Sequence, residues 1–144
     1  MKDVERRKLY STRLESLPDF IKPSDKDLYI QGDISTAADT TITKKLYLLG
    51  TWTAYVLEIL SDVEADILNL KQSLKTLEAQ AYTQSTGTAA VRQANVDCDL
   101  FVIESRTTLS KKEGLQIKIK NILLAYDKLY AAYSRELSRR SLKI

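Results

Sequence analysis

The last third of this 144-residue chain has an excess of cationic side chains that could bind a charged ligand. Residues 101–144 contain ten Lys and Arg against four Asp and Glu, whereas residues 35–100 contain five against eight. Guanidinium and ammonium groups bind phosphate oxygens, so this segment favours a polyanionic partner. Cations near a helix end also stabilise its negative dipole end, which is the structural alternative. The candidate phosphate-binding residues are Lys128, Arg135, Arg139, Arg140 and Lys143.

Aromatic side chains accompany these cations on the same stretch of chain. An unpaired nucleic-acid base can stack on an aromatic ring while neighbouring cations hold the backbone. Tyr126 and Tyr133 fall at the apolar spacing of the second helix described below, so we expect them in a helical core. Trp52 and Tyr130 are the freer candidates for stacking.

Residue counts and motifs argue against an enzyme. The chain has no histidine, the most common general base and metal ligand. It also lacks the GxxxxGK[ST], GxGxxG and GxSxG motifs. Its one cysteine, Cys98, stands between Asp97 and Asp99, which do not activate a thiol. A Mg²⁺ site is conceivable among Glu58, Asp62, Glu64 and Asp66, but hydrated charges or pairs one helical turn apart are more common. We expect no catalytic residue, no metal and no cofactor.

Apolar residues recur at alternating three- and four-residue steps from Leu46 to Ala81, which is the spacing of a heptad seam. The pattern predicts a helix over about residues 38–82, beginning between Ser35 and Lys44. Such a helix is long for a compact domain, so we expect an elongated or oligomeric bundle. We assign contacts between copies to the centre of this seam, at Val56, Leu60, Val63, Ile67, Leu70 and Leu74.

A second amphipathic helix is predicted over about residues 110–142. Ser110 and Glu113 form a capping box at its start, and its seam runs from Leu115 to Tyr133 at the same spacing. Residues 83–95 include Gly87 and suit a loop or a frayed helix end, after which residues 96–106 are assigned to helix rather than strand. The predicted fold class is therefore all-α, with the two long helices as an antiparallel hairpin.

The first 34 residues form a separate N-terminal piece in this interpretation, and residues 35–144 form one helical domain. A short helix ends before Pro18, and an extended arm follows it that docks either on its own chain or on a neighbour. Asp33, Ser35 and Thr36 offer caps for the first long helix. No apolar run approaches the roughly 20 residues of a spanning helix, and no signal peptide is evident, so we expect a cytoplasmic protein without membrane contact.

Several residues stand at characteristic places along the two expected helices. They are Leu46, Tyr47 and Trp52 at the start of the first helix, Tyr82 at its end, Leu109 and Ser110 before the second helix, and Ser134 with Arg135 near its close. In this order, and with a short arm ahead of them, they resemble the recombination-mediator proteins of T4-like phages. The similarity covers roughly residues 30 to 140.

That resemblance implies a non-enzymatic, ring-like homo-oligomer in the host cytoplasm. It would bind single-stranded DNA and help to load a RecA-type recombinase onto strands covered by single-strand-binding protein. The resemblance adds Lys111 and Lys112 to the candidate DNA-binding residues. The acidic first helix would repel DNA, which confines the expected contact to the second helix or a rim. A helical scaffold or adaptor that binds only protein partners is the alternative.

Overall fold

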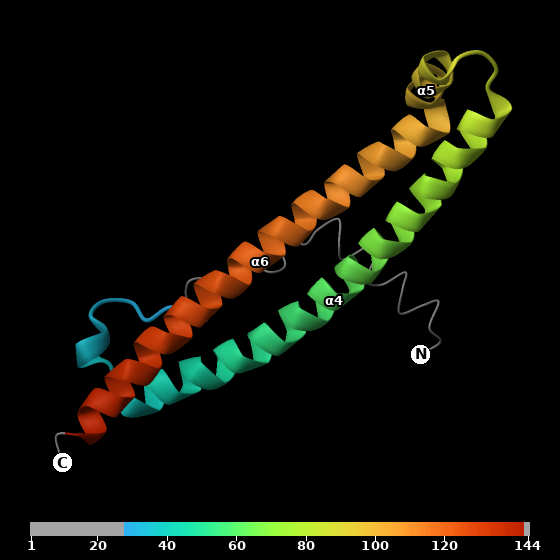
Figure 1. Cartoon of the computed structure of the whole chain (residues 1–144). Helices are drawn as coiled ribbons and strands as arrows, with labels where there is room; N and C mark the ends of the chain where they lie inside the picture. The colour runs from blue at the N-terminus through green and yellow to red at the C-terminus, as the bar shows by residue number, and fades with distance from the viewer. Residues whose placement is uncertain (1–27, 143–144) are drawn as a thin grey trace, which may run out of the picture. The chain divides into compact units, whose positions relative to one another are not determined.

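A computed structural model describes residues 28–142 of the chain, and Figure 1 shows the order of their elements. A short 3₁₀ helix, η1, spans Ile34–Thr36 and is followed by the long helix α4, Asp39–Gln84. The ten-residue helix α5, Ala89–Cys98, leads into a second long helix, α6, Leu100–Ser141. No strand occurs among the described residues, so the all-α prediction is confirmed. The helix predicted before Pro18 and the cation Lys143 lie outside the described residues.

The bounds of α4 agree with the helix predicted over about residues 38–82. Its threonine-rich start is tolerated because hydroxyls donate to carbonyls one turn earlier, as Thr43 Oγ1 does to Asp39 O at 2.8 Å. The predicted caps were wrong, since Asp33 caps η1 instead of α4. The Asp33 carboxylate accepts from the Ser35 amide at 3.0 Å, and Thr36 Oγ1 donates to Asp33 O at 2.8 Å.

Helix α6 begins ten residues before the predicted start, because Asp99 rather than Ser110 caps it. Asp99 Oδ1 accepts from the amides of Phe101 at 3.0 Å and Val102 at 3.1 Å. Ser110 and Glu113 lie inside the helix, so the predicted capping box is wrong. The amides it would have satisfied already donate to carbonyls of the preceding helical turn.

Helix α5 corrects the loop predicted over residues 83–95. Thr88 caps it by accepting from the Val91 amide at 3.3 Å, and Gly87 turns the chain with a φ of 107° that favours glycine. The connection to α4 is therefore only residues 85–88. Residues 96–106 are helical as predicted, apart from the break at Asp99.

The described chain divides into two compact units. The first unit contains residues 28–59 and 120–142, and the second unit contains residues 60–119. Within each unit, α4 and α6 run in opposite directions, as predicted for a helical hairpin (Figure 1). The buried apolar residues are Leu28, Ile42, Leu49, Val56, Ile59, Tyr126 and Tyr133 in the first unit, and Val63, Ile67, Val96, Val102 and Ile119 in the second.

The α4 seam is used inside these units, which requires a correction to the residues assigned to contacts between copies. Val56 is buried in the first unit, and Val63 and Ile67 are buried in the second. Leu60, Leu70 and Leu74 are half-buried in the second unit. These side chains stabilise the chain's own core, so the heptad spacing of α4 is explained without a second copy.

Candidate nucleic-acid interface on helix α6

The candidate DNA-binding residues are distributed over both units. Lys111 and Lys112 belong to the second unit, whereas Lys128, Arg135, Arg139 and Arg140 belong to the first. All six of these side chains are on α6. Each unit is described in turn below, because the six residues have different surroundings.

Arg140 is committed to the fold of the first unit. Its guanidinium donates to Glu136 Oε1 at 2.9 Å and also contacts Asp39 Oδ1 at the start of α4. Its Nη2 donates to the carbonyls of Ile34 at 3.1 Å and Ser35 at 3.2 Å. Arg140 therefore joins the end of α6 to η1 and to α4, which gives it a structural role that the sequence did not predict.

Arg139 also forms hydrogen bonds with the Glu136 carboxylate. It donates to Glu136 from Nε at 2.9 Å and from Nη2 at 2.6 Å, while Glu136 itself is only 8% exposed. Hydrogen bonds from Arg139 and then Arg140 lower the pKa of Glu136 from 4.5 to about 2. Arg139 remains exposed, and its Nη1 takes no part in these two bonds.

Arg135 and Lys128 are exposed and form no ion pair with any residue in the described ranges. Arg135 borders a surface hollow of about 570 Å³ in the first unit. The hollow is lined by Tyr130, Ala131, Ser134, Arg135, Ser138, Arg139 and Leu142. Two exposed cations, Arg135 and Arg139, and an aromatic ring thus border one open hollow on the surface of α6.

The four candidate aromatics separate clearly by burial. Tyr130 is 50% exposed, which agrees with its prediction as a free ring. Tyr126 and Tyr133 are buried, so their assignment to the core is confirmed. Trp52 is half-buried and packs edge-to-face on Tyr55 at 5.9 Å between ring centroids, so it is part of the packing rather than a free platform.

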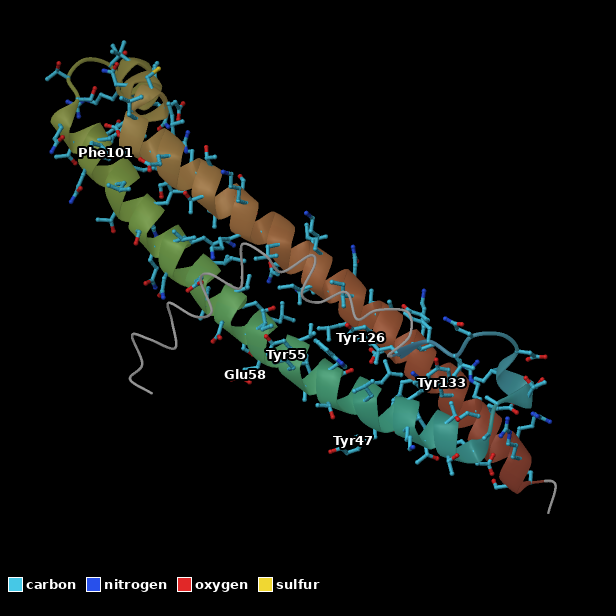
Figure 2. All side chains as sticks on the ribbon, turned by 180° about the vertical axis from the view of Figure 1, so that it is seen from behind. Tyr47, Tyr55, Glu58, Phe101, Tyr126 and Tyr133 are labelled. Carbon is cyan, nitrogen blue, oxygen red and sulfur yellow. The ribbon has the colours of Figure 1, made fainter. Side chains whose placement is uncertain are left out.

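The Tyr133 hydroxyl also forms hydrogen bonds with residues 28–30, the segment that leads into η1. The hydroxyl donates to Leu28 O at 2.7 Å and accepts from the Ile30 amide at 3.0 Å. Figure 2 shows Tyr133 where this segment passes over α6. The described end of the predicted arm, residues 28–33, therefore docks on its own chain.

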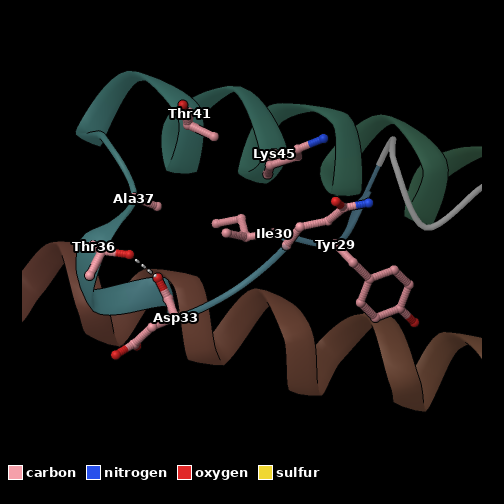
Figure 3. A pocket seen from close by; sticks show the side chains of 8 residues that line it. Tyr29, Ile30, Asp33, Thr36, Ala37, Thr41 and Lys45 are labelled. Carbon is pink, nitrogen blue, oxygen red and sulfur yellow. Dashed lines mark hydrogen bonds between the residues drawn. The ribbon is translucent and has the colours of Figure 1, made fainter.

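A second hollow in the first unit lies between this segment and α4 (Figure 3). Its volume is about 550 Å³, and its only charged lining residues are Asp33 and Lys45. The Ser35 amide and hydroxyl lower the pKa of Asp33 by hydrogen bonding to its carboxylate. That carboxylate is already used as the η1 cap, so this hollow presents no converging set of binding groups.

In the second unit, Lys111 is exposed, and Lys112 Nζ lies 3.6 Å from Asp66 on α4. Gln116 Nε2 donates to Glu64 at 3.2 Å, so two of the α4 carboxylates bind side chains of α6. No group of three or more Cys, Asp or Glu within residues 28–142 is arranged to hold a metal ion.

Arg106 is a structural residue of the second unit that the sequence pattern did not indicate. It donates to Glu78 Oε1 on α4 from Nη2 at 3.0 Å and to Asp97 Oδ1 on α5 from Nη1 at 3.0 Å. These hydrogen bonds raise the pKa of Arg106. Arg106 therefore links all three helices of the second unit, a role that becomes visible only once α5 is known.

Comparison with known proteins finds no matching family model, no matching curated protein and no matching solved structure. Within residues 28–142, no helix has a stretch long and apolar enough to span a bilayer.

Proposed function

We propose that this chain is a non-enzymatic, homo-oligomeric protein that binds single-stranded DNA and assists the loading of a recombinase in a phage-infected cell. The observation that carries the proposal is the exposed face of α6 in the first unit, where Arg135 and Tyr130 border one hollow. Such a surface offers phosphate contacts and a stacking platform together, without reading a base sequence. The partners, a recombinase and a single-strand-binding protein, follow from the family resemblance.

The electrostatics of α6 support DNA as the polyanion. Lys111 in the second unit, and Lys128 and Arg135 in the first, are exposed and form no ion pair with a described residue. A DNA phosphate can replace counterions at such groups, whereas Arg140 would have to break four internal contacts first. We therefore assign phosphate binding to Lys111, Lys128 and Arg135, with Arg139 as a partial contributor.

Exposed apolar side chains support assembly into a homo-oligomer. Tyr47 is 79% exposed on the first-unit part of α4, and Figure 2 shows it projecting away from α6. Ile117 is 61% exposed on the second-unit part of α6. A second copy that covered these side chains would remove their apolar surface from water, which favours assembly.

The test is binding of a fluorescent oligonucleotide at several salt concentrations, with the mass of the protein measured in the same buffers. We expect affinity to fall steeply as salt rises, because phosphate contacts release counterions. We also expect a single-stranded oligonucleotide to compete better than a duplex, since Tyr130 can stack only on unpaired bases. Absence of binding at low salt contradicts the proposal.

A scaffold or adaptor that binds only protein is the second candidate, and one observation favours it. Leu100 is 78% exposed and Phe101 is 71% exposed where α6 begins, and both are close in the chain to the exposed Val91 on α5. An aromatic and an aliphatic side chain so exposed suit a protein anchor. This candidate predicts a stable assembly that binds no oligonucleotide at any salt concentration.

A further inference from the structure

We infer that the hollow on α6 between Tyr130 and the Arg135 and Arg139 side chains is a binding site for one unpaired nucleotide, with the base against Tyr130 and the phosphate on the guanidinium groups. The inference rests on the proposed DNA-binding function and specifies its site. All the lining residues belong to the first unit, and all but Leu142, which directly follows α6, belong to that helix. The site is therefore carried by one helix whose residues are held in a fixed register.

Helix geometry explains why this face is hollow. Successive residues are about 100° apart around the helix axis, so Ala131, Ser134 and Ser138 share one face. Their side chains are short and form a floor. At the same angular spacing, Tyr130 stands at one edge of this floor, and Arg135 with Arg139 stands at the other. The result is a shallow trough that is open to solvent, with an aromatic wall at one edge and a cationic wall at the other edge, about 140–180° away around the helix axis.

The size of the trough suits a nucleotide. Its volume is about 570 Å³, and it is open to solvent on one side, so a nucleotide can enter without any movement of the helix. The half-exposed ring of Tyr130 offers apolar surface to a flat base. The hydroxyls of Ser134 and Ser138 can form hydrogen bonds with a sugar or a phosphate.

The charges select an anionic occupant. Arg135 has no carboxylate partner among the described residues. Arg139 donates hydrogen bonds to Glu136 from Nε and Nη2, and Arg140 also donates to the Glu136 carboxylate. Arg139 is thus partly neutralised by Glu136 and Asp33, whereas Arg135 has no carboxylate partner in the described chain. A flat apolar group bearing a phosphate complements both walls of the trough.

The experiment compares two oligonucleotides of equal length, one of thymidines and one with the same backbone but abasic sites. The substitution Tyr130→Leu removes the ring and keeps an apolar side chain, and Tyr130→Phe is its matched control. We expect Tyr130→Leu to weaken binding of the thymidine oligonucleotide by roughly tenfold and to leave the abasic one unchanged. Tyr130→Phe should bind both as the wild type does.

The cationic wall is tested by Arg135→Gln, with Lys128→Gln as the matched control on the same helix. Both remove one exposed cation, so both should weaken binding of the thymidine and abasic oligonucleotides and reduce its salt dependence. Only Arg135→Gln should also reduce photochemical crosslinking of an iodouracil oligonucleotide to Tyr130, because only Arg135 holds the phosphate beside that ring. Crosslinks are located by mass spectrometry of the full chain.

Each other outcome is decisive. Wild-type protein that binds no oligonucleotide at low salt overturns both the inference and the proposed function. Binding that survives Tyr130→Leu unchanged, with crosslinks elsewhere, overturns the site but not the DNA-binding function. A lower oligomeric mass for Tyr130→Leu, with unchanged affinity per bound strand, overturns the site and identifies the trough as a contact between copies.

Discussion

Three arginines near the end of α6 look equivalent in the sequence, but their surroundings give them different roles. Arg140 contacts Asp39, which is 101 residues away in the chain, and the carbonyls of Ile34 and Ser35. Arg135 forms no such contact within the described chain and remains available to a ligand. Composition predicted the basic cluster. It could not predict that Arg140 is used in the fold while Arg135 is free to bind a ligand, because Asp39, Ile34 and Ser35 are about 100 residues from Arg140 in the sequence.

Glu136 is the residue through which this cluster depends on pH. Its pKa is about 2 in the fold, below the ordinary value of 4.5, so its ion pairs stabilise the protein above about pH 4.5. Protonation removes that contribution as pH falls from 4.5 toward 2. We expect Glu136→Gln to melt at a lower temperature than the wild type at pH 7, with the difference shrinking steadily below pH 4.5.

Circular dichroism melts between pH 7 and pH 2.5 measure this effect. Asp127→Asn is the control, since Asp127 is an exposed carboxylate on α6 that forms no ion pair with a described residue. Its melting temperature should follow the wild type at every pH. A difference between Glu136→Gln and the wild type that stays constant down to pH 2.5 contradicts the assigned role.

Tyr133 provides a second test at the level of a single residue. Tyr133→Phe keeps the buried ring but leaves the Ile30 amide and the Leu28 carbonyl without their partner. We expect a loss of about 1–3 kcal/mol in the free energy of unfolding, the usual effect of leaving a buried polar group unsatisfied. Amide exchange at Ile30 should accelerate as well. Tyr130→Phe is the control, because the exposed Tyr130 should change neither quantity.

At the scale of the elements, periodicity predicted the long helices well, whereas local capping signals did not predict their ends. The α4 seam contains about five heptads from residue 46 to residue 81, so chance agreement is small. A cap, by contrast, rests on two or three residues. Ser110 with Glu113 had the pattern of a capping box, but Asp99 supplied the cap eleven residues earlier. A local pattern does not indicate which of two adequate caps begins the helix, because the amides after Ser110 bond within the helical turns that Asp99 starts.

The cap itself is testable with Asp99→Ala. Loss of the carboxylate leaves the amides of Phe101 and Val102 without an acceptor, so we expect a cost of about 1 kcal/mol in the free energy of unfolding. Faster amide exchange should be confined to the first turn of α6. Ser110→Ala is the matched control, because an interior helix position that caps nothing should tolerate alanine. Equal destabilisation by both substitutions contradicts the assignment of the cap.

At the scale of the whole molecule, the apolar residues of the described chain fall into a buried group and an exposed group. The seams of α4 and α6 are used within the units, where Val56, Val63 and Ile119 are fully buried. The apolar side chains that remain exposed were not recognised from the sequence, because they fall outside the dominant heptad positions. If the protein assembles, these exposed residues are available for contacts between copies, whereas the buried seam residues are not.

Ile117 and Ile119 on α6 of the second unit allow a test of which residues form contacts between copies. Ile117 is 61% exposed and Ile119 is fully buried, although the two are neighbours in sequence. We expect Ile117→Asp to lower the oligomeric mass in analytical ultracentrifugation while the helical circular dichroism signal is retained. Ile119→Asp should instead unfold the second unit, because a charge there cannot be buried without a partner. Lys118→Asp controls for added negative charge at an exposed site. An unchanged mass for Ile117→Asp would exclude this part of α6 from the contact between copies.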